Sequence, residues 1–133
     1  MNDSHTRKLD RAALNQSLFL ARHRVSLIVV EGRGEGTEHV ITAPSLTIGR
    51  GPAVDIVIAD DAMSKQHVAL EVTAEGFRVR DLGSTNGVQV NGSKVPAADL
   101  KHGDRIALGE HVLQYIVESM DRVGTYTLED DQP

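Results

Sequence analysis

The segment DLGSTNGVQVNG, Asp81–Gly92, joins two strand-like runs through a loop that is longer and more polar than a hairpin requires. A two-residue Asn-Gly turn is enough to reverse an antiparallel pair of strands. Here Asn86 and Gly87 are preceded by a glycine, a serine and a threonine. The extra hydroxyl groups and the Asn86 amide need either hydrogen-bond partners inside the loop or a ligand.

Short β signals flank this loop on both sides and extend over most of the chain. Val68, Leu70 and Val72 alternate with other residues at the period of a half-buried strand, and the run that begins at Phe77 alternates in the same way. Turn-forming residues separate these segments at a spacing of about 8–12 residues. The pattern predicts an all-β fold, a sandwich or barrel of antiparallel strands. The expected strands are 25–31, 38–42, 45–49, 55–58, 67–72, 77–82, 88–91, 105–108 and 111–118.

The two ends of the chain differ in composition from this β-rich body. Residues 1–24 carry a net charge of +3, residues 25–118 carry −5 and residues 119–133 carry −3. Apolar residues near helical spacing predict a short helix over Leu9–His23. We therefore expect an N-terminal extension at 1–24 that includes this helix, one β-rich domain at 25–118, and an acidic, flexible C-terminal tail at 119–133.

Composition argues against several classes of protein. The 133-residue chain has a net charge of −5, whereas a nucleic-acid binder needs clustered Lys and Arg to contact phosphates. It has no cysteine and six scattered histidines, so we expect no metal and no cofactor. No apolar run approaches the roughly 18 residues of a membrane span, and no signal pattern opens the chain. The sequence therefore predicts a cytoplasmic protein with neither a nucleic acid nor a membrane as partner.

Three short motifs supply hydrogen-bond donors at strand ends. The motif TIGRG contains Arg50, SKQH contains Ser64 and Lys65, and GSTNG contains Thr85 and Asn86. In β folds, binding residues concentrate in such loops. A guanidinium, two hydroxyls, an amide and an ammonium together form a donor-rich set that suits an oxyanion.

The order of these motifs resembles that of the forkhead-associated (FHA) domain, a phosphothreonine-recognition module. The resemblance rests on Gly-Arg at 49–50, SxxH at 64–67 and STNGxxVNG at 84–92, and it spans about residues 25–118. The segments DIVIADDAMSKQH and LKHGDRIALGEHVLQY are also similar to that family. The three motifs in this order, inside a β-rich chain, make the match specific.

The resemblance implies a role for each matching residue. Arg50 and Ser64 would bind the phosphate, and Lys65 would add a positive charge. Thr85 would contribute from the opposing loop, and Asn86 would hydrogen-bond the backbone of the bound peptide. The family's structural positions match Gly49, His67 and Gly87. The resemblance also implies an eleven-strand β-sandwich with the ligand held by loops at one end, which adds strands too short for periodicity to show, such as one near Ser93–Lys94.

The physical chemistry of the ligand agrees with this implied site. A phosphothreonine carries about −1.5 to −2 charges near neutral pH and three acceptor oxygens. One arginine fork, two hydroxyls and a lysine can satisfy those oxygens without a strongly basic surface. The acidic body is then no contradiction, because salt screens distant charges over about 8 Å.

The sequence thus predicts a non-catalytic signalling adaptor that binds phosphothreonine in a partner protein and acts downstream of a Ser/Thr protein kinase. One alternative is a hydrolase with Ser64 as nucleophile and His67 as base, although no third orienting residue is evident. Another is a structural subunit that binds partners without phosphate. If Thr125 or Thr127 is phosphorylated, the tail would fold back onto Arg50 and Ser64; the competing interpretation is a disordered tail that aids solubility.

Overall fold

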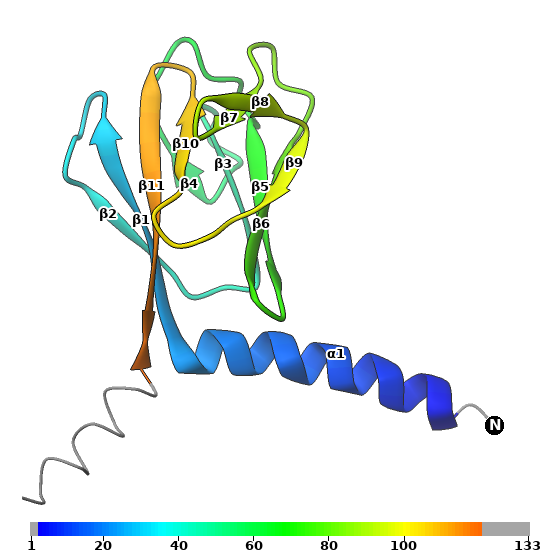
Figure 1. Cartoon of the computed structure of the whole chain (residues 1–133). Helices are drawn as coiled ribbons and strands as arrows, with labels where there is room; N and C mark the ends of the chain where they lie inside the picture. Colours follow the sequence, from blue (N-terminus) through cyan, green and yellow to red (C-terminus); the bar gives the residue numbers. More distant parts are fainter. Residues whose placement is uncertain (1–2, 121–133) are drawn as a thin grey trace, which may run out of the picture.

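The computed structural model describes residues 3–120 and shows one helix and eleven strands over that range (Figure 1). The predicted tail, with Thr125 and Thr127, lies outside the described residues from position 121 onward. The elements are α1 (Asp3–Arg22), β1 (His23–Glu31), β2 (Glu38–Ile41), β3 (Ser45–Gly49), β4 (Ile56–Val57), β5 (Val68–Thr73), β6 (Gly76–Asp81), β7 (Val88–Val90), β8 (Ser93–Val95), β9 (Ala97–Asp99), β10 (Arg105–Leu108) and β11 (His111–Ser119).

The strands form two sheets, so the predicted all-β sandwich of eleven short strands is confirmed. Their orders are β2-β1-β11-β10-β7-β8 and β4-β3-β5-β6-β9. The recorded strand pairs are antiparallel except β3 with β4, which run parallel. β1 and β11 make the longest pairing, which begins with His23 opposite Ser119. Both β2 and β4 stand at a sheet edge.

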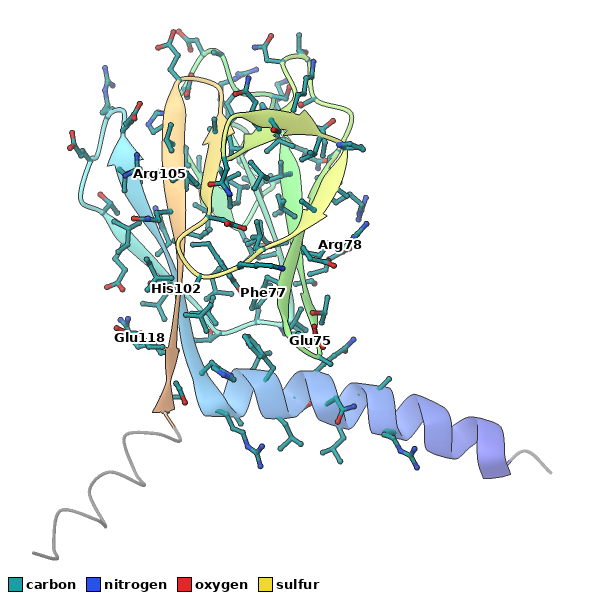
Figure 2. The ribbon with its side chains drawn as sticks, viewed as in Figure 1. Glu75, Phe77, Arg78, His102, Arg105 and Glu118 are labelled. Carbon is teal, nitrogen blue, oxygen red and sulfur yellow. The ribbon has the colours of Figure 1, made fainter. Side chains whose placement is uncertain are left out.

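The core lies between the two sheets and follows the predicted alternation. Val68 and Leu70 of β5 and Phe77 of β6 are buried. Arg78 projects outward from β6 and forms an ion pair with Asp99 at 3.0 Å (Figure 2). The opposite sheet contributes the buried side chains of Val25, Leu27, Val29, Ile106, Leu108, Leu113 and Tyr115. One apolar face on each sheet is therefore what holds the sandwich together.

The N-terminal helix is confirmed, and it is longer than expected, because it begins at Asp3 rather than Leu9. Only its C-terminal part packs against the sandwich, and the rest projects away from it (Figure 1). Phe19 is buried with its ring edge-to-face with Phe77, the centroids 6.4 Å apart. His23 Nδ1 donates to the Phe19 carbonyl over 2.9 Å, which satisfies one of the free carbonyls at the end of the helix.

Two strands are too short to show a period in the sequence. β8 lies where a strand near Ser93–Lys94 was expected. β9 is an additional strand that the sequence pattern does not predict, because it has three residues and follows directly after Pro96. Its pairing with β6 is a tertiary contact that local alternation cannot reveal.

The loops after β3, β4 and β6 lie at the end of the sandwich opposite α1 (Figure 1). These three loops carry the residues that the sequence motifs single out. The geometry that brings them together therefore decides whether those residues form one site.

Candidate functional site

The loops that follow β3 and β4 are joined by backbone hydrogen bonds. The N–H of Arg50 donates to the Ser64 carbonyl over 3.0 Å, and the N–H of Gly51 donates to the Lys65 carbonyl over 3.1 Å. This close approach requires Gly49, because a Cβ atom at that position would overlap the Lys65 carbonyl. Gly49 thereby places Arg50 alongside Ser64.

Gly49→Ala is therefore expected to destabilise the protein by about 1–3 kcal/mol, since the new methyl group meets backbone that cannot move freely. Urea unfolding measures the effect. Gly51→Ala is the matched control, because its methyl group would lie 3.0 Å or more from the nearest atoms of Lys65, whereas a methyl group at position 49 would overlap the Lys65 carbonyl. We expect Gly51→Ala to cost less; equal costs would contradict this account of Gly49.

His67 connects the loop after β4 to the loop after β6. Its side chain is fully buried, and Nδ1 accepts a hydrogen bond from the Ser64 N–H at 3.0 Å. Nε2 lies 2.7 Å from the Gly87 carbonyl. Because a backbone N–H can only donate and a carbonyl can only accept, the ring hydrogen sits on Nε2. Gly87 itself has a φ of +79°, which glycine adopts without strain.

The loop after β6 is built around Asp81. Its Oδ2 accepts from the N–H of Gly83 at 3.1 Å and of Ser84 at 3.2 Å. The Ser84 hydroxyl donates to the other oxygen of Asp81 and accepts from the Gly87 N–H. An aspartate shortly before a glycine is a typical Asx-turn signal, and it could have predicted this scaffold from the sequence. Some of the extra polar groups of the loop therefore have a structural role, and the hydroxyl of Ser84 is the one with partners inside the loop.

Arg50 is exposed but not free to swing. Its Nε donates to the Met63 carbonyl over 2.9 Å, which fixes the direction of the side chain. Within residues 3–120, no partner is assigned to either terminal nitrogen of its guanidinium group. A guanidinium held in this way presents a planar fork of N–H donors, the arrangement that matches an oxyanion.

The other loops add donors and acceptors beside this fork. The Ser64 Oγ accepts from the Thr85 N–H at 3.0 Å, which leaves the hydroxyl hydrogen of Ser64 able to donate elsewhere. Asn86 Nδ2 donates to the Ala62 carbonyl at 2.8 Å, so its side-chain oxygen is left to accept. Thr85 and Asn86 are both exposed.

Four of the predicted site residues, Arg50, Ser64, Thr85 and Asn86, therefore belong to one hydrogen-bonded group of loops. The fifth residue, Lys65, follows Ser64 directly and is exposed, with its Cβ next to Gly51. Its ammonium group has no assigned partner within the described part of the chain. Lys65 thus adds a mobile positive charge at the edge of the group, without a fixed place in it.

A buried contact between Asp60 and His111 was not predicted from the sequence. Asp60 Oδ2 lies 2.7 Å from His111 Nδ1, and the Asp60 carboxylate also accepts from the N–H groups of Glu110 and Ala62. His111 Nε2 lies 3.0 Å from the Arg33 carbonyl, so the imidazole ring connects the Asp60 carboxylate to the loop that carries Arg33. Burial alone would raise the pKa of Asp60, but the hydrogen bonds from His111, Glu110 and Ala62 outweigh it and lower that pKa.

Arg50 also lines a hollow of about 660 Å³ beside the group of loops. Arg33, Asp61 and Glu110 line the same hollow, so its wall carries both signs of charge. Among the described residues there is no cluster of three or more His, Asp or Glu side chains that could hold a metal ion. No helix within that part of the chain has the length and apolarity needed to cross a bilayer.

Comparison with known proteins gives a consistent picture. The family model described as FHA domain matches residues 46–109. The chain is 32% identical over 90 residues to the glycogen accumulation regulator GarA of Mycolicibacterium smegmatis, covering 68% of this chain and 57% of that protein. It is also 32% identical over 90 residues to the oxoglutarate dehydrogenase inhibitor of Corynebacterium glutamicum, covering 68% and 63%. The chain therefore spans about six tenths of the length of these curated relatives.

The solved structures that resemble the chain include FHA domains. One comes from an analysis of phosphothreonine-dependent FHA domain interactions. It superimposes with a TM-score of 0.64 at 29% sequence identity, over 70% of this chain and 95% of that one.

Proposed function

The chain belongs to the FHA domain family, and we propose that it is a non-catalytic adaptor that binds phosphothreonine through Arg50, Ser64, Lys65, Thr85 and Asn86. The observation that carries this proposal is the bond from Arg50 Nε to the Met63 carbonyl. This bond fixes the orientation of the guanidinium group, whose terminal nitrogens have no assigned partner among the described residues. Beside it, the Ser64 hydroxyl accepts a hydrogen bond from the neighbouring loop and can still donate its own hydrogen to a ligand.

The available groups suit the two parts of such a ligand. A phosphate offers three acceptor oxygens and about two negative charges, which match the guanidinium fork, the Ser64 hydroxyl and the Lys65 ammonium. The exposed Thr85 hydroxyl would add a donor from the opposite loop. The side-chain oxygen of Asn86 would accept a hydrogen bond from a peptide N–H, which would orient the chain that carries the phosphate.

The hydrolase alternative receives no support from this geometry. A general base must face the hydroxyl that it activates. His67 Nδ1 instead accepts from the backbone N–H of Ser64, and Nε2 donates to the Gly87 carbonyl. Both ring nitrogens therefore have backbone partners, and neither faces the Ser64 oxygen.

We further propose that the chain acts in the cytoplasm, downstream of a Ser/Thr protein kinase, and changes the activity of an enzyme that it binds. Two relatives bear names of regulators, a glycogen accumulation regulator and an oxoglutarate dehydrogenase inhibitor. A binding domain without catalytic groups can regulate by recruitment or by contact with its partner. The kinase supplies the phosphothreonine that makes this contact conditional.

The tail is a poor source of that phosphothreonine for the same chain. β11 runs away from the loops for nine residues, a distance of about 26 Å at roughly 3.3 Å per residue. Thr125 lies six residues beyond Ser119 and spans at most about 21 Å, while Thr127 spans about 28 Å only when fully extended. A partner protein is therefore the expected source of the phosphothreonine.

The test is an affinity measurement of the full chain against oriented peptide libraries that contain phosphothreonine, phosphoserine or unmodified threonine at a fixed position. We expect binding to the phosphothreonine library and little binding to the unmodified one. Equal binding to phosphorylated and unmodified peptides would refute the proposed function and would favour a phosphate-independent structural subunit.

A further inference from the structure

One flank of the sandwich, between the edge strands β2 and β4, is hollowed along its length. Hollows of about 660, 180 and 330 Å³ follow one another there. The first two share Arg33, Val57, Ala59 and His111, and the second and third share His39. Neighbouring hollows share lining residues, so the three lie in a row along this flank, and together we call them the flank groove.

The flank groove begins at the candidate phosphate site. Arg50 lines its first hollow, and Ser45 and Leu46 line its last. Because β3 connects these positions, the groove extends for about 17 Å at roughly 3.3 Å per strand residue. That length accommodates about five residues of an extended peptide.

The sides of the groove expose apolar side chains and strand edges. Val57 of β4 is 54% exposed and Val40 of β2 is 48% exposed, two of only four large apolar side chains with this exposure within residues 11–120. β4 pairs only with β3, and β2 pairs only with β1. An unpaired strand edge beside apolar side chains is the surface to which an extended peptide adds as a further strand.

The charges along the groove are divided between its two ends. Arg33 and Arg50 lie in the first hollow together with Asp61 and Glu110. The last hollow is lined by one acidic residue, Asp55, and by His39 but by no Lys or Arg, and its other lining residues include Val40, Ile41, Leu46 and Ile56. A ligand that fills the whole groove would therefore be charged at the phosphate end and apolar at the far end.

We propose that the flank groove binds the segment of the partner protein that continues from its phosphothreonine, as an extended strand with apolar side chains directed at Val57 and Val40. This inference rests on the proposed phosphothreonine site, with which the groove is continuous through Arg50. The phosphate site gives conditional binding, and the groove selects partners by a sequence some residues away from the phosphate.

The experiment compares three phosphothreonine peptides with the same core for binding to the full chain. The short peptide has three residues on each side of the phosphothreonine, and the longer ones add six residues, alternating valine and threonine, on one side or the other. We expect one of the longer peptides to bind about tenfold more tightly than the short one, because it buries apolar surface that the short peptide leaves exposed.

Val57→Ser combined with Val40→Ser should remove this gain and leave the affinity for the short peptide unchanged. Leu14→Ser is the matched control, because Leu14 is 55% exposed but lies on α1, at the other end of the molecule. Hydrogen exchange should show protection of residues 39–41 and 56–57 by the longer peptide only. The inference is wrong if neither longer peptide binds more tightly, or if the double variant keeps the gain. If the wild-type chain does not bind even the short phosphothreonine peptide, the proposed function itself is refuted.

Discussion

Arg50→Ala should lower the affinity for a phosphothreonine peptide by about 100-fold or more. Two hydrogen bonds from a guanidinium to a charged oxygen contribute about 1.5–3 kcal/mol each, and 100-fold corresponds to about 2.7 kcal/mol. The substitution should change stability little, because Arg50 is exposed and donates one side-chain hydrogen bond, to the Met63 carbonyl. Isothermal titration with wild type and variant measures the effect.

Two further variants separate geometry from charge. Arg50→Lys keeps the positive charge but loses the planar fork, so it should recover only a small part of the lost affinity. Arg105→Ala removes the same charge from an exposed position on β10 (Figure 2) and should leave the affinity nearly unchanged. If Arg105→Ala weakens binding as much as Arg50→Ala does, the effect is one of net charge, and Arg50 has no specific role.

Most of the fold could be predicted because most of its strands show an alternation of apolar residues in the local sequence. The alternation of Val68, Leu70 and Val72 marks a strand with one buried face, and the same residues are buried in the structure. β9 shows no such alternation, because the three residues after Pro96 are too few to reveal a period. The strand forms through its pairing with β6. The length of α1 also escaped prediction, because its first residues lack a clear apolar stripe and, among residues 11–22, Phe19 is the one buried side chain.

The site is predictable in part for a related reason. Arg50, Ser64 and Asn86 stand in motifs that the family resemblance recognises, and the structure brings their loops together. The side chains of Arg50 and Asn86 are held by the backbone carbonyls of Met63 and Ala62. The side chains of Met63 and Ala62 give no indication of this role. Every residue has a backbone carbonyl, so the residue type at one position does not show which carbonyl accepts a hydrogen bond from a site residue.

The Asp60–His111 pair was missed because its members lie 51 residues apart. Each looks like an ordinary polar residue in its local sequence, one in a loop and one at the start of a strand. Only the folded chain shows that both are buried and in contact. Removing this pair is the second substitution from which a large effect is expected.

Asp60→Asn is expected to lower the free energy of unfolding by about 1–3 kcal/mol, the usual cost of leaving buried hydrogen-bonding groups without partners. The carboxylate accepts hydrogen bonds from His111 and from the backbone N–H groups of Ala62 and Glu110. An amide turns one acceptor into a donor, so it cannot accept all three of these hydrogen bonds. Asp61→Asn, at the neighbouring exposed aspartate, is the matched control and should have little effect.

The pH dependence gives the same prediction a second measurement. The pKa of Asp60 is lower in the folded protein than its ordinary value near 3.8, so its contribution to stability is fully present above that value. It is lost as the pH falls through the lower, folded-state pKa. The difference in free energy of unfolding between wild type and Asp60→Asn, measured by urea unfolding, should therefore shrink as the pH falls below about 3.8. A difference that stays constant as the pH falls would contradict a carboxylate stabilised by these hydrogen bonds.

The same variant should also weaken peptide binding, although Asp60 is not one of the residues proposed to bind the phosphothreonine. Its carboxylate holds the Ala62 N–H, and its backbone carbonyl accepts from the Met63 N–H at 2.9 Å. The carbonyls of Ala62 and Met63 in turn hold Asn86 and Arg50. Once the Asp60 anchor is lost, those carbonyls shift and the guanidinium fork loses its direction. At a temperature where Asp60→Asn remains folded, we expect it to bind the phosphothreonine peptide several-fold more weakly than wild type, and we expect Asp61→Asn not to share this loss. If Asp60→Asn is unstable but binds normally, the Asp60–His111 pair supports the fold without positioning the site.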